Sequence, residues 1–488
     1  MPPNDDHCSP GWFHGMIAGM SEALRKKQVW IVLCIALFIR LLIPVLAALI
    51  HHDPAVYYAD DTLSYLQPAR EMLAQGTFTQ AGRPELFRTP GYPILLIPGL
   101  LLGGVAGVTI ALQVVLGTVT VLLVYRLGML VFANGRIAFL AMCLYAIEPL
   151  AIIFCGLLLS ETLFTAVMVS FLICFVRFIR APFWRYGVPA AVLLAATVYI
   201  RPVSLYLFIP LTLVAVGYFL LSKNKQGCVQ ALVFGAIAFL LPMAWTVRNR
   251  VVAGYSGFAS VSDVNLYAYS AAAVLAARDH VSYLEMMDAQ NRRAAEYQRA
   301  HGLTEGQVLQ YMRGEGVRII MSNPLTYAGI HVKGMVRMTF DPAAVEYLKM
   351  LKLYPHRGGL LGQIIDRGIF AVALDLMKNN PVFFWAQVLL FIQLVGYYFL
   401  FIFYFFGKVK MPAVLLLVLL VFLGYMVIIA GGPNSLDRFR HPLMPVVCLF
   451  AGAGGLALWE RVRKKRMEKE KAGPEDLPDG DQTTNGNC

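Results

Sequence analysis

The feature that most constrains the fold of this chain is a series of ten long apolar runs spread over its 488 residues. A helix needs about twenty mostly apolar residues to cross the hydrocarbon core of a bilayer, and its backbone must find its hydrogen bonds within the segment. The runs therefore predict an all-α polytopic membrane protein with about ten transmembrane helices. The expected spans cover residues 29–51, 105–125, 137–154, 160–177, 187–201, 203–221, 228–246, 383–406, 411–431 and 441–459.

The composition excludes a soluble globule. Apolar residues make up 58% of the chain and charged residues 14%, and the mean hydropathy is +0.63. A soluble domain carries about 25% charged residues. The net charge of +12 arises partly from short loops and from a basic run over residues 461–471. Membrane topology and contact with anionic lipid explain such charges, so nucleic acid is not an expected partner.

Basic residues indicate the orientation of the chain. With ten spans, the basic residues near 25–27, 177–185 and 461–471 fall on one side, which the positive-inside rule assigns to the cytoplasm. Two long segments, 52–104 and 247–382, then lie outside; we expect amphipathic helices in the first and mainly helical structure in the second. The expected units are a cytoplasmic N-terminus (1–28), a transmembrane catalytic module with the first outer loop (29–246), the outer segment (247–382), C-terminal transmembrane helices (383–459) and a basic, then disordered, cytoplasmic tail (460–488).

The cysteines do not predict a disulfide or a soft-metal site. None of the eight cysteines lies in the two expected outer segments, and no CxxC motif or Cys/His cluster occurs. We therefore expect no disulfide in the two outer segments, even if they face an oxidising compartment.

The first outer segment is more polar than a connection between two spans requires. It carries the adjacent acids Asp60 and Asp61, several arginines, and apolar residues at helical spacing from Leu63 onward. Aspartate is a favoured residue just before the first turn of a helix. We therefore expect one of the two acids to cap an amphipathic helix that begins near Leu63.

Charged residues also gather at the outer ends of the expected spans. A charge near hydrocarbon costs several kcal/mol unless it is paired or solvated, so such residues favour a functional interpretation. Arginine binds phosphate through rigid pairs of N–H donors. A single arginine at the end of a span is about equally often a residue whose side chain extends to the lipid headgroups and binds no substrate. The pattern predicts a site that holds a phosphate-bearing substrate at the membrane boundary while an aspartate handles a proton. The residues concerned are Glu161, Arg88, Arg201, Arg248, Arg438 and Arg440.

Several short motifs follow one another along the chain. They are Asp60-Asp61-Thr62-Leu63-Ser64-Tyr65, Arg70-Glu71-Met72-Leu73, Arg88-Thr89-Pro90-Gly91-Tyr92-Pro93, Ser160-Glu161-Thr162-Leu163-Phe164, Arg201-Pro202, Trp245 with Arg248-Asn249, Asn323-Pro324, and Arg438-Phe439-Arg440-His441-Pro442. In this order they resemble the motifs of the GT-C membrane glycosyltransferases that use polyprenyl-phosphate sugars. The resemblance covers most of the chain and is strongest to bacterial relatives of protein O-mannosyltransferases and of the lipid A aminoarabinose transferase.

The resemblance implies roles for individual residues. The first outer loop of the family carries a catalytic aspartate; spacing to Tyr65 favours Asp61, but Thr62 stands where many members have glutamate, so Asp60 stays an alternative. Glu161 corresponds to a second acidic position that could position the acceptor, hold a divalent cation or pair with an arginine. The implied ligands of the donor phosphate are Arg88, Arg201, Arg248, Arg438 and Arg440, and the implied substrate-positioning residues are Tyr65, Tyr92 and Asn249.

The expected function is thus an inverting transfer of a sugar from a polyprenyl-phosphate donor to an acceptor hydroxyl, with an aspartate as general base. The acceptor could be a protein, a lipid or a glycan, and the need for a divalent metal stays open. The implied location is a bacterial inner membrane with the site facing the periplasm. A transporter, a lipid-linked saccharide flippase or a polymerase are the alternatives. Charges near one membrane face, rather than at the midplane, favour the enzyme.

Overall fold

The computed structural model describes residues 27–354 and 369–472. The expected cytoplasmic N-terminus before Lys27, part of the outer segment and the end of the cytoplasmic tail lie outside the described residues. Within them the chain is helical except for loops and one short antiparallel hairpin, in which Thr79 pairs with Pro84 and Gln80 with Arg83. Its strands are β1 (Thr79–Gln80) and β2 (Arg83–Pro84).

Eight helices of the described part are long and apolar enough to cross a membrane, as judged by length and composition. The other two expected spans coincide with the shorter apolar helices α6 (Gly135–Ala146) and α9 (Trp184–Ile200). The protein is therefore an all-α polytopic membrane protein. The eight are α2 (Lys27–His51), α5 (Val105–Phe132), α8 (Glu161–Arg180), η2 with α10 (Pro202–Leu221), α11 (Lys225–Ala253), α20 (Pro381–Tyr404), α21 (Ala413–Ala430), and η4 with the main part of α22 (Asp437–Glu468).

The third expected span is broken rather than continuous. Helix α6 ends at Ala146, and α7 (Pro149–Ile153) starts after a two-residue gap, because proline cannot continue the hydrogen bonding of a preceding helix. The fully buried Arg40 of α2 donates to the carbonyls of Ala146 at 2.9 Å and Tyr145 at 3.3 Å. On the other side of the break, Glu148 accepts from the N–H of Ala151 at 2.6 Å. The sequence analysis missed both charges, which satisfy the free backbone groups at the break.

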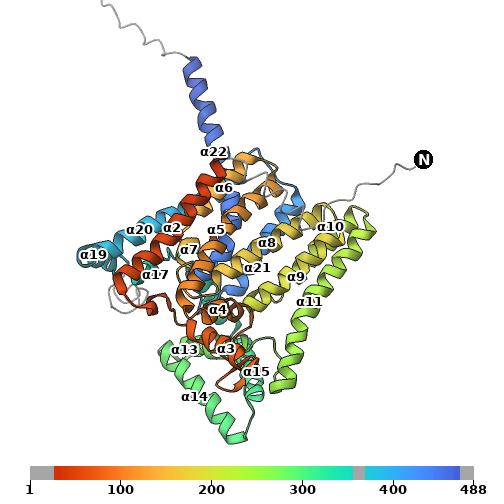
Figure 1. The fold of residues 1–488 in the computed structure, drawn as a ribbon, viewed down its shortest axis with the longest axis vertical. Helices are drawn as coiled ribbons and strands as arrows, with labels where there is room; N and C mark the ends of the chain where they lie inside the picture. The colour runs from red at the N-terminus through yellow and green to blue at the C-terminus, as the bar shows by residue number, and fades with distance from the viewer. Residues whose placement is uncertain (1–26, 355–368, 473–488) are drawn as a thin grey trace, which may run out of the picture.

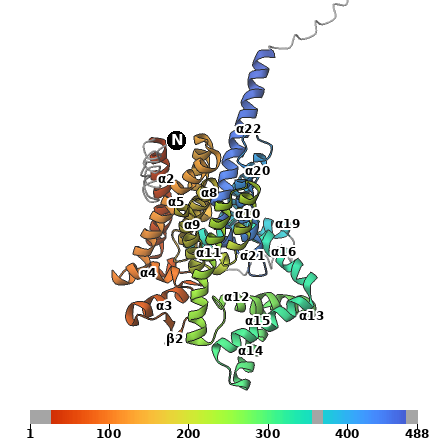
Figure 2. The ribbon, with the colours of Figure 1, turned by 90° about the vertical axis from the view of Figure 1, so that its right-hand side faces the viewer.

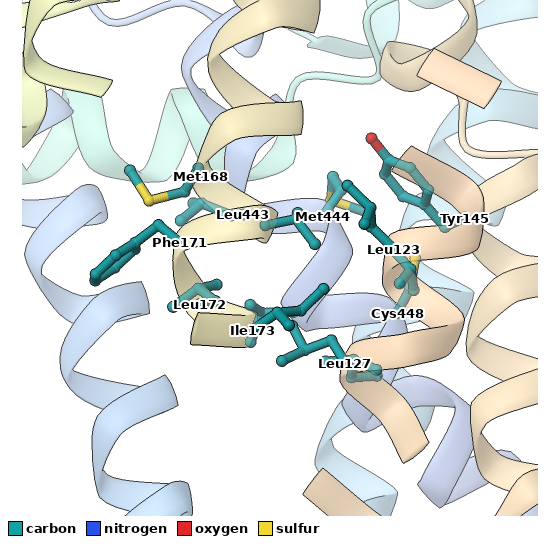
Figure 3. Close-up of a cluster of buried hydrophobic side chains, with 14 of the residues drawn as sticks. Leu123, Leu127, Tyr145, Met168, Phe171, Leu172, Ile173, Leu443, Met444 and Cys448 are labelled. Atoms are coloured by element: carbon teal, nitrogen blue, oxygen red, sulfur yellow. The ribbon is translucent and has the colours of Figure 1, made fainter. Parts of the chain in front are cut away.

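The core of the bundle lies among α5, α6, α8 and α22. Figure 3 shows Leu123 and Leu127 of α5 facing Ile173 of α8, with Met444 of α22 beside them, and all four belong to one buried cluster. Lipid tails are as apolar as leucine, so close packing, rather than escape from water, favours such contacts in a membrane. Helix α8 packs against α5 and meets η4, and α22, which follows η4, packs against α6. The candidate site lies at the start of α8 and at η4.

The helices outside the spans gather at one end of the bundle. Figures 1 and 2 show α22 projecting from the opposite end, while α3, α14 and α15 lie beyond the ends of the spans. The part of the outer segment that the structure describes is helical, in agreement with the sequence. The first outer loop contains η1 (Pro54–Tyr57), α3 (Thr62–Gln75) and α4 (Gly91–Leu101). The outer segment contains α12 (Val261–Val264), the π-helix η3 (Asn265–Ala271), α13 (Ala272–Asp279), α14 (Tyr283–His301), α15 (Glu305–Ser322), α16 (Pro324–Phe340), α17 (Ala344–Met350) and α19 (Ile369–Asn379). Among the spans, η2 (Pro202–Ser204) precedes α10 (Phe208–Leu221), and η4 (Asp437–Leu443) precedes α22 (Met444–Ala472).

Candidate functional site

Asp61 lies at the centre of a group of charged side chains from distant parts of the sequence. Its Oδ1 pairs with Nη2 of Arg88 at 2.6 Å, and its Oδ2 pairs with Nη1 of Arg438 at 2.6 Å. The Asp61 side chain keeps 23% of its exposure, so the group is partly open to the outside. One carboxylate thus joins the start of α3, the loop before α4 and the short helix η4.

The Arg88 side chain is held on every side. Its Nε donates to Oγ of Ser64 at 2.8 Å, its Nη1 donates to the hydroxyl of Tyr65 at 3.2 Å, and its guanidinium lies 4.4 Å from the centroid of the Tyr65 ring. Ser64 and Tyr65 lie on the first turn of α3, directly after Asp61. The guanidinium is therefore preorganised before any ligand binds.

Glu161 and Arg201 form a second pair beside the first. Nη1 of Arg201 lies 2.5 Å from Oε1 of Glu161, and Nε of Arg438 lies 3.9 Å from the same oxygen. Glu161 is 1% exposed, and neither of its oxygens has a hydrogen bond of good geometry within the described residues. Arg438 thus connects the two carboxylates. These five residues, Asp61, Arg88, Glu161, Arg201 and Arg438, form the charged centre. Its three guanidinium groups and two carboxylates leave one positive charge uncompensated.

The two expected tyrosines lie in different surroundings. Tyr65 contacts Arg88 and lies 3.3 Å from Oγ of Ser160, whereas Tyr92 is fully buried beneath it, with ring centroids 4.9 Å apart. The hydroxyl of Tyr92 donates to Oε1 of Gln113 at 2.8 Å. Tyr92 therefore supports the Tyr65 ring and has no exposed surface for a substrate. Its position in the motif did not show how deeply the side chain is buried.

Arg248 and Asn249, both expected at the substrate, fasten backbone segments instead. Arg248 donates to the carbonyls of Glu85 at 3.0 Å and Phe78 at 2.8 Å. Asn249 is fully buried and donates to the carbonyls of Gly257 and of the next residue. Arg248 thus ties the two flanks of the hairpin in the first outer loop to the end of α11, and Asn249 ties residues 257–258 to the same helix end.

Arg440 also has backbone partners. It is 3% exposed, and its Nη1 donates to the carbonyls of Met338, Thr339 and Asp341 at 2.9, 3.1 and 2.7 Å. These carbonyls lie at the end of α16, where a positive charge also interacts favourably with the helix dipole. The structure therefore separates Arg440 from Arg438, although the sequence motif places them two residues apart.

We expect Arg440→Ala to lower the free energy of unfolding by on the order of 3 kcal/mol, because it leaves three carbonyls unpaired at the end of α16. Thermal unfolding of the purified protein in detergent measures this change. The matched control is Arg337→Ala, which removes an exposed arginine of α16, the helix whose carbonyls Arg440 binds. An unchanged melting temperature for Arg440→Ala, together with weaker binding of a lipid phosphate, would return Arg440 to the phosphate site.

The structure separates the two adjacent aspartates. Asp60 is exposed and makes no hydrogen bond or ion pair with any residue that the structure describes, whereas Asp61 binds two arginines. Asp61 occupies the N-cap position of α3, as expected for one of the two acids, but its side chain makes no capping hydrogen bond. Thr62 fixes the start of the helix instead: its Oγ1 accepts from the N–H of Ala59 at 2.9 Å and donates to the carbonyl of Leu158 at 3.0 Å.

The charges around Asp61 determine its protonation. Burial disfavours the carboxylate and by itself would raise its pKa, but the neighbouring guanidiniums of Arg438 and Arg88 outweigh burial and hold the pKa of Asp61 below its usual value. Asp61 is therefore ionised at neutral pH. A carboxylate held by two arginines is a weak base, so it gains basicity only if at least one arginine takes another anion.

The described residues do not form a site for a divalent cation. No group of three or more histidine, cysteine, aspartate or glutamate side chains with metal-binding geometry occurs among them. A hard cation takes six or more oxygen ligands, whereas the two carboxylates here face guanidinium groups. The donor set at the centre fits an anion.

Three solved structures of the oligosaccharyltransferase from Archaeoglobus fulgidus are similar to this chain. They are AglB with an inhibitory peptide and a dolichol-phosphate, a complex with Zn and sulfate, and the apo form; each is 14% identical, with TM-scores of 0.48, 0.49 and 0.49. The matches cover 91–93% of this chain but only 51–53% of the neighbours, so the chain spans about half their length.

At 14% identity and TM-scores below 0.5, this likeness supports no conclusion about the substrate, the reaction or the roles of residues in this chain. No protein-family model matches the sequence, and no curated protein matches it at a significant level.

Proposed function

We propose that the protein is a membrane glycosyltransferase that moves a sugar from a polyprenyl-phosphate donor to an acceptor hydroxyl. The observation that carries the proposal is the position of Asp61 between Arg88 and Arg438, with both carboxylate oxygens paired at 2.6 Å. A general base and two phosphate ligands thus share one place at the edge of the bundle. Arg201 extends this set of ligands, whereas Arg248 and Arg440 hold backbone segments.

The arginines suit a leaving phosphate. The phosphate gains negative charge as the bond from the sugar C1 to its oxygen breaks, and preorganised donors stabilise that charge best. Phe439 supports two of the guanidiniums, since its ring centroid lies 5.3 Å from Cζ of Arg201 and 5.2 Å from Cζ of Arg438. Arg88 is held separately by Ser64 and Tyr65, so all three guanidiniums are kept close to the position proposed for the phosphate.

The charge of the centre favours a donor with a single phosphate. A sugar linked to a polyprenol through one phosphate carries one negative charge, which matches the one uncompensated positive charge of the centre. When Asp61 takes the proton of the acceptor, the centre gains a second positive charge, and the leaving phosphate monoester approaches two negative charges at neutral pH. A diphosphate donor would exceed the charge of the centre at both stages.

The proposed reaction is a single displacement. The donor phosphate attracts Arg88 and Arg438, which releases Asp61 and raises the pKa of its carboxyl. The acceptor oxygen then attacks the sugar C1, its proton passes to Asp61, and the polyprenyl phosphate leaves from the opposite face. The configuration at C1 is inverted. Glu161, which is fixed by Arg201, positions the acceptor or the arginines.

The location of the site supports an outer-face reaction. The site lies at the end of the bundle away from the projecting part of α22, which carries the basic residues Arg461, Arg463, Lys464 and Lys465. The positive-inside rule places that basic end in the cytoplasm. We propose that the protein lies in a bacterial inner membrane with the site facing the periplasm. Its units would be the cytoplasmic N-terminus (1–28), the transmembrane catalytic module (29–246), the outer segment (247–382), the C-terminal transmembrane helices (383–459) and the cytoplasmic tail (460–488). The acceptor could be a protein, a lipid or a glycan.

A transfer assay tests the proposed function. Purified protein in nanodiscs is given labelled polyprenyl-monophosphate and polyprenyl-diphosphate sugars and a panel of peptide, lipid and glycan acceptors. We expect transfer from the monophosphate donor only, with the anomeric configuration inverted in the product. Transfer from the diphosphate donor alone, or from a nucleotide sugar, would contradict the proposal.

One observation favours the transporter or flippase alternative. Transporters place charges at broken helices inside the membrane, and the break between α6 and α7 has Arg40 on one side and Glu148 on the other. A flux assay in proteoliposomes distinguishes the two functions. Passage of a lipid-linked saccharide across the bilayer, without any transfer product, would support the transporter.

A further inference from the structure

Glu85 occupies an unusual position just before Arg88. It follows β2, is 3% exposed, and was not singled out by any sequence motif. Its Oε1 accepts from the N–H of Phe87 at 2.6 Å and from the N–H of Arg88 at 2.7 Å. One buried carboxylate oxygen therefore fixes two successive peptide groups, and the second of them carries the Arg88 side chain.

The neighbouring peptides are held from the other side. The carbonyl of Glu85 accepts from Arg248 at 3.0 Å, and the carbonyl of Leu86 accepts from the N–H of Ser260 at 2.8 Å. The Leu86 side chain is 2% exposed and belongs to the small core that includes Tyr255. Residues 85–87 are thus clamped between the hairpin and the outer segment, and the Arg88 side chain extends from this clamp to Asp61.

The Arg88 guanidinium needs such a fixed origin. It binds Asp61, Ser64 and Tyr65 at once, and a long flexible side chain meets three partners only if its backbone stays in place. We propose that Glu85 is the positioning residue for Arg88, and that it sets the affinity of the site for the donor phosphate. This inference rests on the proposed function, in which Arg88 binds that phosphate.

The chemistry of the contact predicts which substitutions preserve it. The two donors to Glu85 are neutral peptide N–H groups, so an amide oxygen can replace the carboxylate oxygen. Burial raises the pKa of Glu85, against the N–H donors and the Arg88 guanidinium, and Glu305 of α15 raises it further. Arg248 of α11 is the other facing charge. Because ionisation is disfavoured and unnecessary for the contact, Glu85→Gln should preserve it, whereas Glu85→Leu should not.

The first experiment measures binding of a polyprenyl monophosphate to the full-length protein in nanodiscs. We expect Glu85→Leu and Arg88→Ala each to weaken binding about 10- to 100-fold, and Glu85→Gln to stay within about threefold of wild type. In an Arg88→Ala background, Glu85→Leu should add no further loss. The matched control is Glu305→Gln, which removes an exposed carboxylate that also faces this region.

Two results would overturn the positioning role. One is wild-type affinity in folded Glu85→Leu, and the other is a further loss of affinity when Glu85→Leu is added to Arg88→Ala. If Glu85→Leu does not fold, Glu85→Ala decides, because it removes the acceptor oxygen without adding a bulky apolar side chain. Wild-type affinity in folded Glu85→Ala would also overturn the proposal.

A second experiment separates this inference from the proposed function. The rate at which phenylglyoxal modifies Arg88, followed by mass spectrometry, reports the pairing of the guanidinium without any substrate. We expect phenylglyoxal to modify Arg88 faster in Glu85→Leu, or in Glu85→Ala where that variant replaces it, than in wild type, and at the wild-type rate in Glu85→Gln. If the wild type binds no lipid phosphate but these rates differ as expected, the proposed function fails and the positioning role stands. Equal rates in all variants would overturn the positioning role.

Discussion

We expect Asp61→Asn to abolish sugar transfer and to leave the protein folded and inserted. The amide cannot accept the acceptor proton, and general base catalysis contributes about 10²- to 10⁴-fold to such a step. Binding of a polyprenyl monophosphate should tighten rather than weaken, because Arg88 and Arg438 lose the carboxylate that competes for them. Turnover and lipid-phosphate affinity, measured on the same preparation, check both parts of this expectation.

Asp60→Asn is the matched control for this prediction. Asp60 is the adjacent exposed acid, so its substitution removes the same charge from the same loop without touching the arginines. We expect wild-type turnover. Full activity in Asp61→Asn, or loss of activity in Asp60→Asn alone, would move the base away from Asp61. A similar loss in both variants would mean that the loop charge, rather than one carboxylate, is required.

Arg438→Ala should have the second largest effect. Arg438 contacts Asp61 at 2.6 Å and lies 3.9 Å from Glu161, and its removal leaves the centre without net positive charge. Each charge-assisted hydrogen bond to the phosphate contributes about 1.5–3 kcal/mol, so affinity for a polyprenyl monophosphate should fall about 10- to 100-fold. The rate of transfer should fall further, by about 10²- to 10³-fold, because the leaving phosphate loses a preorganised donor.

Arg438→Lys distinguishes charge from geometry in the same assay. Lysine restores the positive charge but offers a single flexible ammonium group, which cannot reach both carboxylates in the way that the planar guanidinium does. We expect lysine to recover part of the affinity and little of the rate. The exposed Arg318→Lys in α15 serves as the control. Full recovery of the rate by lysine would show that the bridging geometry is unimportant.

The spans were predictable, whereas the break inside one of them was not. Apolar runs alone located the ten helical regions, because the membrane requires both their length and their composition. The break between α6 and α7 had a local signal in Glu148-Pro149, and the buried Arg40 was visible as an arginine inside an apolar run. Neither residue shows its partner in the sequence, since their contacts depend on how α2 packs against α6.

The site was predictable in part, for a similar reason. Position at the outer end of a span placed Arg88, Arg201 and Arg438 near Asp61, but such a position does not say which way a side chain points. Arg248 and Arg440 occupy comparable positions and turn to backbone carbonyls. Among the acids of the first outer loop, Asp61 pairs with arginines, whereas Glu71 and Glu85 accept hydrogen bonds from backbone N–H groups.

Glu71 shows why this loop is so rich in polar residues. It accepts from the N–H of Ala81 at 2.7 Å and from Oγ1 of Thr79 at 2.5 Å, which holds the hairpin against α3. Glu85 holds the backbone of Arg88. Part of the polar character of the loop therefore builds the frame of the site, and only Asp61 among these acids faces the arginines that we assign to the phosphate.

The most direct test of the central claim is equilibrium binding of one polyprenyl monophosphate to wild type, Asp61→Asn and Arg438→Ala in identical nanodiscs. If Asp61 and the lipid phosphate compete for the same guanidiniums, affinity should be highest in Asp61→Asn, intermediate in wild type and lowest in Arg438→Ala. Equal affinities in the three proteins, or no binding to the wild type, would contradict the claim that this centre holds a lipid phosphate.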